Sequence, residues 1–164
     1  MEINNSPLIE IMKDNLPSLS YQKRLGYRTN LIEVEELYKL INHNIFDNKL
    51  HMPELIVSGR CRKYWGMCFG AIEKPEDSNT YCRIKLMDKW YCRQWLITTL
   101  AHEMCHQYQW DIIGPIREEQ GKFPLMSHGP SFFIHRNKLA EHGVSLKKAH
   151  SRKKWFETQD FFKS

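Results

Sequence analysis

From about Trp90 to Trp110 the chain contains neither glycine nor proline, the two residues that most readily interrupt a helix. Large apolar side chains recur along this stretch, at Trp95, Leu96, Leu100 and Met104. The stretch therefore predicts a long helix that is buried on most of its surface. A chain of 164 residues is long enough to build a single core around such a helix.

The chain before this helix predicts one shorter helix and then three strands. Asn30, with Glu33 three positions on, resembles a capping box, and apolar residues at helical spacing follow to about Phe46. Beyond Pro53 the pattern changes to short β-rich runs at 54–59, 66–72 and 82–87. Because short links join these runs, we expect a three-stranded antiparallel sheet.

The chain after the long helix predicts a loop and one more helix. The loop is rich in glycine and proline, and the final helix should run from Pro130, which suits a first helical turn, to a C-cap at Gly143. The order helix, three strands, helix, loop, helix is typical of an α+β fold. We assign it to residues 30–143, with a weakly patterned lead-in at 1–29 and a tail at 144–164.

The basic charge of the chain is concentrated in that tail. The net charge is +5, and residues 145–164 alone hold six Lys or Arg against two acids. Cations interleaved with aromatic side chains suit a polyanion whose bases can stack. A solvated chain end is the alternative interpretation.

Composition excludes several classes of protein. Aromatic residues at 12% and charged residues at 26% are globular values, and no apolar run approaches the roughly 20 residues of a membrane span. The first residues carry acids where a signal peptide would carry basic residues and an apolar core, so we expect a soluble, cytoplasmic protein, or a nuclear one in a eukaryote. Five cysteines without CxxC spacing argue against a disulfide framework and against a thiolate zinc ribbon.

The long helix contains the pentad His102-Glu103-Met104-Cys105-His106, an HExxH pattern. Positions i and i+4 lie on one helical face, so both imidazoles can reach the same cation, and imidazole suits Zn²⁺. Glu103 follows the first histidine and can act as general base on a water at the metal. The alternative is a pair of helix histidines that only bond to their neighbours.

A catalytic zinc site needs a third protein ligand. The extended HExxHxxGxxH pattern is excluded, because the chain has Gln109 and Ile112 where that pattern has glycine and histidine. His128 is the favoured ligand, since a Gly-Pro turn fixes it at the boundary of the last helix. The other possible ligands are Glu118, Glu119, Glu141, His135 and His142.

The two histidine motifs together resemble those of the SprT-like (Spartan-type) zinc metalloproteases. HEMCH at 102–106 is followed by SHGPSF at 127–132, and LYKLINHNIFDNKL at 37–50 resembles the first helix of that family. The resemblance covers roughly residues 30–142. It implies a zincin-like α+β protease domain that holds one zinc ion with His102, His106 and His128 and uses Glu103 as base. It also implies a protein substrate bound or crosslinked to DNA, with DNA as the activator.

Two departures from the family pattern concern the access of substrate to the site and the binding of DNA. The loop from His106 to His128 is longer than the family leads us to expect, and no paired cysteines follow the last helix to form the zinc ribbon of many bacterial members. DNA, with single strands favoured, would then bind other basic and aromatic groups. The candidates are Arg60, Arg62, Lys63, Trp65, Lys147, Lys148, Arg152, Lys153, Lys154 and Trp155.

The main rival interpretation is a DNA-binding or regulatory module with a structural zinc. Such a site would close its fourth position with a protein ligand, usually cysteine or histidine. Cys105 lies inside the motif but points about 100° away from His106 around the helix, and the glutamate at 103 favours catalysis. A zinc hydrolase acting on another bond is the third possibility.

Overall fold

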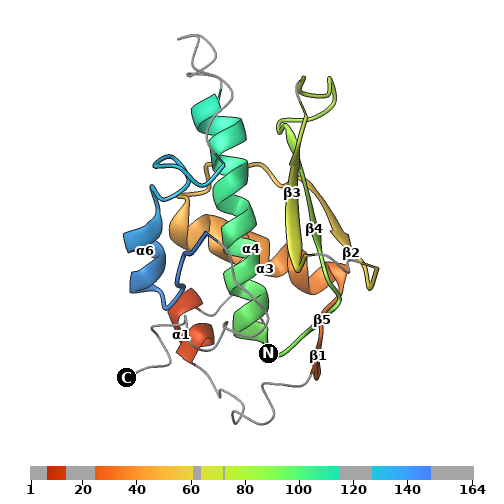
Figure 1. Cartoon of the computed structure of the whole chain (residues 1–164), viewed down its shortest axis with the longest axis vertical. Helices are drawn as coiled ribbons and strands as arrows, with labels where there is room; N and C mark the ends of the chain where they lie inside the picture. The colour runs from red at the N-terminus through yellow and green to blue at the C-terminus, as the bar shows by residue number, and fades with distance from the viewer. Residues whose placement is uncertain (1–6, 14–24, 61–63, 72, 115–126, 149–164) are drawn as a thin grey trace.

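The structure, a computed structural model, describes residues 7–13, 25–60, 64–71, 73–114 and 127–148. Helix α4 runs through the middle of the molecule, with the strands on one side and α1 and α6 on the other, and α3 crosses behind it (Figure 1). The elements in chain order are α1 (Leu8–Lys13), β1 (Tyr27–Arg28), α3 (Leu31–Ile45), β2 (Glu54–Val57), β3 (Gly66–Gly70), β4 (Cys82–Leu86), β5 (Lys89–Trp90), α4 (Arg93–Tyr108), the π-helix η2 (Gln109–Ile113) and α6 (Arg136–Glu141).

Helix α3 confirms the helix predicted at 30–46. The side chain of Asn30 accepts a hydrogen bond of 2.9 Å from the backbone N–H of Glu33, as the capping pattern requires. The carboxylate of Glu33 binds the hydroxyl of Thr29 at 2.6 Å. After the helix, Asp47 and Asn48 adopt φ angles of 53° and 60°, a left-handed conformation that Asp and Asn tolerate better than most residues. These two residues end the helix where the sequence predicts.

The prediction of a wholly antiparallel sheet is wrong. The strand order is β2-β4-β3, with β3 antiparallel to β4 but β2 parallel to β4. The chain leaving β2 must therefore cross to the far side of β4 before β3 begins, so the segment between β2 and β3 is not a hairpin loop. Local periodicity shows which face of a strand is buried but not the direction of the neighbouring strand. The parallel pairing of β2 with β4 could therefore not be predicted from it. A second, antiparallel pair joins β1 to β5.

Helix α4 confirms the long buried helix, and it continues directly into η2. The last helix begins later than predicted: α6 starts at Arg136, whereas the prediction placed its first turn at Pro130. Residues 127–135 form consecutive turns, in which the N–H of Phe132 bonds to Gly129 O at 3.0 Å. Proline suits a turn as well as a first helical turn. The predicted end is confirmed, since Gly143 has a φ angle of 82° just beyond α6.

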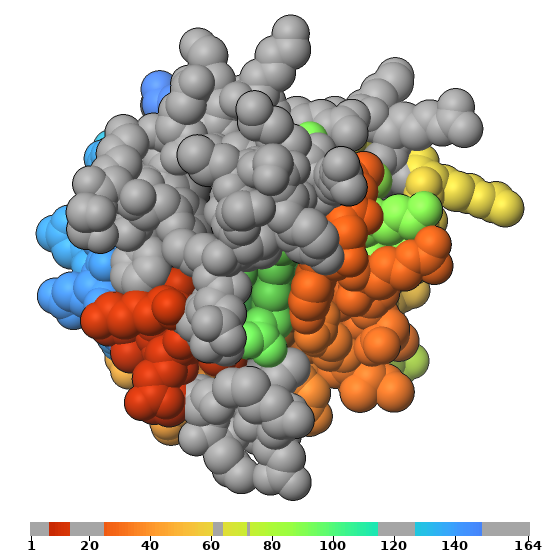
Figure 2. All heavy atoms as spheres, turned by 90° about the horizontal axis from the view of Figure 1, so that it is seen from below, coloured from red at the N-terminus to blue at the C-terminus, as the bar shows by residue number. Residues whose placement is uncertain are grey.

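The core takes in residues from both ends of the described chain. Helix α1 buries Leu8, Ile11 and Met12, and its Ile11 carbonyl accepts a hydrogen bond from the Gln94 side chain of α4 at 3.3 Å. Figure 2 shows α1 beside α4 from below. Val144 and Leu146, which follow α6, are only 1% and 3% exposed. None of the described helices has the length and apolar character needed to cross a membrane.

A buried polar network joins α3, the end of α4 and the start of β4. The Tyr38 hydroxyl donates to Gln107 Oε1 at 2.7 Å, and Gln107 Nε2 donates to Asp111 Oδ2 at 3.0 Å. Asp111 Oδ1 in turn accepts from the backbone N–H of Tyr81 at 2.9 Å. Burial raises the pKa of Tyr38 far above its usual range, so the hydroxyl keeps its proton. The network holds η2 against the β3–β4 connection.

We expect Tyr38→Phe to destabilise the protein by about 1–3 kcal/mol, because it leaves the buried Gln107 oxygen without its donor. Urea unfolding measures the change. Tyr108→Phe is the matched control: Tyr108 contacts Phe46 and His135 through its ring, which phenylalanine retains, so its effect should stay within about 0.5 kcal/mol. If Tyr38→Phe changed the free energy of unfolding no more than Tyr108→Phe, the Tyr38 hydroxyl would not contribute to stability.

Candidate metal centre

Three histidines from two segments converge at one point. His102 and His106 lie one turn apart on α4, with ring centroids 5.0 Å apart. The ring of His128, which comes from the turns before α6, lies 5.4 Å from the first and 4.8 Å from the second. The potential ligand atoms all lie within 4.8 Å of one another. Within the described residues, these three histidines form a group that could hold a metal ion.

Phe132 lies against all three histidine rings. It is fully buried, and its ring centroid lies 4.8, 4.6 and 4.9 Å from those of His102, His106 and His128. The turn bond from Phe132 N to Gly129 O holds the backbone of Phe132 close to His128, which directly precedes Gly129. An apolar wall of this kind limits the access of water to the ring nitrogens.

The nitrogen chemistry of the cluster fits a metal ion. His128 Nε2 is buried and has no hydrogen-bond partner among the described residues, and a buried polar atom without a partner is costly. Burial lowers the pKa of His106 and, together with the charge of Lys148, that of His128. Both imidazoles are therefore neutral at pH 7, the form in which histidine binds metals.

Glu103 lies beside this cluster, in contact with the sheet. It is only 5% exposed, its Oε1 lies 3.9 Å from His102 Nε2, and it accepts a hydrogen bond from the backbone N–H of Cys68 in β3. Burial raises its pKa to about 8, and the Cys68 bond opposes this rise. Gly66 allows the close approach of β3, because a Cβ at Gly66 would lie 3.0 Å from the Thr99 side chain and 3.3 Å from Cγ of Glu103.

Gln109 also belongs to the site, and sequence reasoning missed it. Its Oε1 lies 2.9 Å from His106 Nδ1, and its Nε2 donates to Ser131 Oγ at 2.9 Å. The sequence interpretation treated Gln109 only as a departure from the glycine of the extended motif. The available signal was its spacing, since a residue three positions after a histidine on a helix lies within reach of it.

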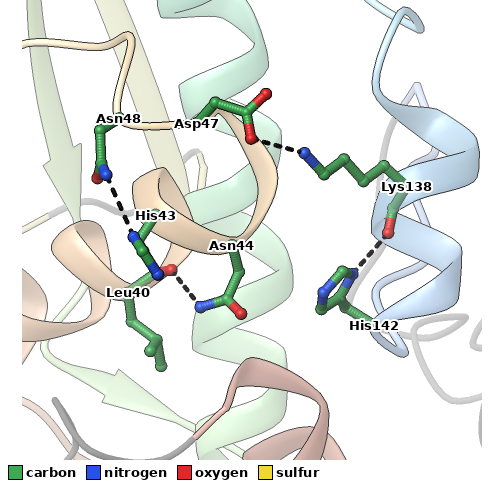
Figure 3. Close-up of polar contacts among 7 residues, drawn as sticks. All are labelled: Leu40, His43, Asn44, Asp47, Asn48, Lys138 and His142. Atoms are coloured by element: carbon green, nitrogen blue, oxygen red, sulfur yellow. Dashed lines mark hydrogen bonds and ion pairs between the residues drawn. The ribbon is translucent and has the colours of Figure 1, made fainter.

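The other histidines and acids proposed as ligands lie elsewhere or outside the described residues. The ring of His135 packs between Phe46 and Tyr108, at 4.6 and 4.5 Å, and burial lowers its pKa to about 4. His142 Nδ1 contacts the Lys138 carbonyl of its own helix at 2.8 Å, and Lys138 pairs with Asp47 (Figure 3). Glu141, on α6, is exposed and not part of the cluster, and Glu118 and Glu119 lie outside the described residues.

The predicted DNA-contacting residues are only partly described. Arg60 and Lys148 are exposed and Lys147 is half-buried. Trp65 packs against the core, with its ring centroid 4.0 Å from that of Trp95. Arg62, Lys63, Arg152, Lys153, Lys154 and Trp155 lie outside the described residues. DNA contact by this set stays a prediction.

Fold and site together define an α+β protein with a three-histidine cluster able to hold a metal ion and a buried carboxyl beside it. The chain belongs to the SprT-like family, whose model matches residues 34–152. This match covers the core of the chain, from α3 to the residues after α6. Membership indicates a metalloprotease-type function and a metal-dependent one.

In the metal-free protein, the stability contributed by Glu103 should fall as the pH rises. The folded pKa of about 8 lies above the unfolded value of 4.5, so the folded protein keeps a proton that the unfolded chain releases between these two values. The free energy of unfolding should therefore decrease from about pH 4.5 towards about pH 8. Glu103→Gln should remove this part of the decrease, as urea unfolding in a chelator at several pH values would measure. An unchanged pH dependence of the free energy of unfolding in the variant would contradict a raised pKa of Glu103 as its cause.

Proposed function

We propose that the protein is a zinc-dependent endopeptidase in which His102, His106 and His128 hold one zinc ion and Glu103 is the general base. The observation that carries the proposal is the convergence of the three imidazoles within 4.8 Å, with a buried carboxyl beside them. Three neutral nitrogen ligands and a fourth open position are typical of catalytic zinc. The ion supplies Lewis-acid polarisation of the peptide carbonyl and activation of water.

Glu103 has the position that a general base requires. Its carboxyl lies next to His102, where it can accept the proton of an attacking water and deliver it to the departing amine. The pKa of about 8 belongs to the metal-free site, where it reflects burial. A divalent cation at the adjacent imidazoles favours the ionised carboxylate and opposes the effect of burial. The metal and the base therefore support each other.

A protein bound or crosslinked to DNA is the substrate that we propose, with single-stranded DNA as activator. The support is the family resemblance and the place where the basic tail begins. Lys148 lies close enough to His128 for its charge to lower the pKa of that imidazole. DNA held at Lys148 would thus lie near the metal cluster, and a protein attached to that DNA would be presented to it. Such a partner implies an intracellular location.

Glu103→Gln should retain zinc but lose proteolysis by about 10²–10⁴-fold, because it removes the base and none of the proposed ligands. The measurements are elemental analysis and cleavage of a DNA-binding protein with and without single-stranded DNA. His128→Ala is the companion variant and should lose zinc as well as activity. Near wild-type cleavage by Glu103→Gln would contradict the proposed role of Glu103 as general base. A zinc-loaded wild type that cleaves no protein would favour the structural-zinc module or a hydrolase of another bond.

The DNA assignment has its own test. A chain truncated after Lys148 keeps the buried Val144 and Leu146 but lacks Arg152, Lys153, Lys154 and Trp155. We expect weaker binding to single-stranded DNA and a flatter salt dependence, by about 0.7 in the log–log slope for each phosphate that the shortened chain no longer neutralises. Zinc content should not change, because the three histidines precede the truncation.

The alternative is that the segment between β2 and β3 holds the DNA. Arg62→Glu combined with Lys63→Glu, measured beside the truncated chain at two salt concentrations, separates this possibility from binding by the tail. A wild-type protein that does not bind DNA, or unchanged binding in both variants, would remove the DNA assignment and leave the protease assignment standing.

A further inference from the structure

We propose that Gln109 is a positioning residue that selects the metal-binding tautomer of His106 and joins the two segments that carry the histidines. This inference rests on the proposed metal binding and goes beyond the HExxH pattern. Gln109 is only 4% exposed although it lies at the junction of α4 and η2, and both ends of its amide have partners in the site.

The first contact concerns His106. With Gln109 Oε1 at 2.9 Å from His106 Nδ1, that ring nitrogen carries the proton and donates it to the amide oxygen. The other ring nitrogen, Nε2, then has its lone pair available for a cation. Metal-binding histidines usually donate their second nitrogen to such an acceptor, which fixes the tautomer and the ring orientation.

The second contact holds the other end of the amide. Gln109 Nε2 donates to Ser131 Oγ at 2.9 Å, and the amide oxygen faces His106. A reversed amide would present N–H₂ to His106 and force the ring proton onto Nε2, which would prevent metal binding there. Ser131 thus contributes to the site by holding in place an amide that is not itself one of the proposed ligands.

The same contact joins two parts of the chain that are far apart in sequence. His106 and Gln109 belong to α4 and its continuation, whereas Ser131 lies three residues after His128 in the turns before α6. One buried amide therefore connects the helix that carries two histidines with the segment that carries the third. Loss of its oxygen should affect the tautomer of His106, and loss of its contact with Ser131 should affect the position of the His128 segment.

The test is zinc affinity, measured by competition with a chromophoric chelator. Gln109→Met keeps the length of the side chain but removes the acceptor, and we expect zinc affinity to fall by about 10–100-fold. Gln109→Glu restores an acceptor for His106 and can accept from Ser131, so its affinity should return to within a few-fold of wild type. Gln94→Met is the matched control: it removes another buried glutamine amide of α4, one that bonds to Ile11 O, and should leave zinc affinity unchanged.

A second measurement needs no variant. Long-range ¹⁵N–¹H NMR of the zinc-loaded wild type should show the His106 proton on Nδ1, and a proton on Nε2 would overturn the proposal. Wild-type zinc affinity in Gln109→Met, or no rescue by Gln109→Glu, would also overturn it. These readouts are independent of proteolysis. If zinc affinity responds as expected but no protein is cleaved, the proposed function fails and the role of Gln109 stands.

Discussion

Three buried polar side chains of α4 bond to the elements packed around this helix, and these contacts organise the molecule. Gln94 binds the Ile11 carbonyl of α1, Gln107 binds Tyr38 of α3 and Asp111 of η2, and Glu103 binds the Cys68 N–H of β3. Each of these three residues thus connects α4 to at least one other element. A buried polar group left without a partner costs about 1–3 kcal/mol, so these contacts select one arrangement of the surrounding elements.

The sequence predicted the elements whose causes are local. The cap at Asn30 and the helical spacing after it define α3, and the absence of glycine and proline defines α4. The approach of His128 to the HExxH histidines also agrees with the sequence interpretation, although its role as a ligand stays a prediction. The parallel pairing of β2 with β4 could not be predicted locally, because alternation along a strand is the same whichever way its neighbour runs.

The start of α6 and the role of Gln109 were missed for different reasons. Pro130 fits both a helix start and a turn. The structure has turns there, and they place Phe132 against the three histidine rings. Gln109 was considered only as the residue at the glycine position of the extended HExxHxxGxxH motif, which the chain does not have. Its partner Ser131 lies 22 residues away, and only the folded arrangement brings their side chains together. Positioning residues of this kind depend on tertiary contacts, so a linear pattern does not reveal them.

If the histidine cluster holds a metal ion as proposed, the burial of Glu103 couples the protonation of its carboxyl to metal binding. Without a metal ion the lowered pKa values of His106 and His128 favour neutral imidazoles, and the pKa of about 8 favours a protonated Glu103 near pH 7. Adding a divalent cation alone would place an uncompensated charge beside Phe132, which is unfavourable in an apolar environment. Ionisation of Glu103 offsets part of that charge. In the proposed mechanism, cation binding should therefore release the proton of Glu103, so that the event that supplies the Lewis acid would also generate the base.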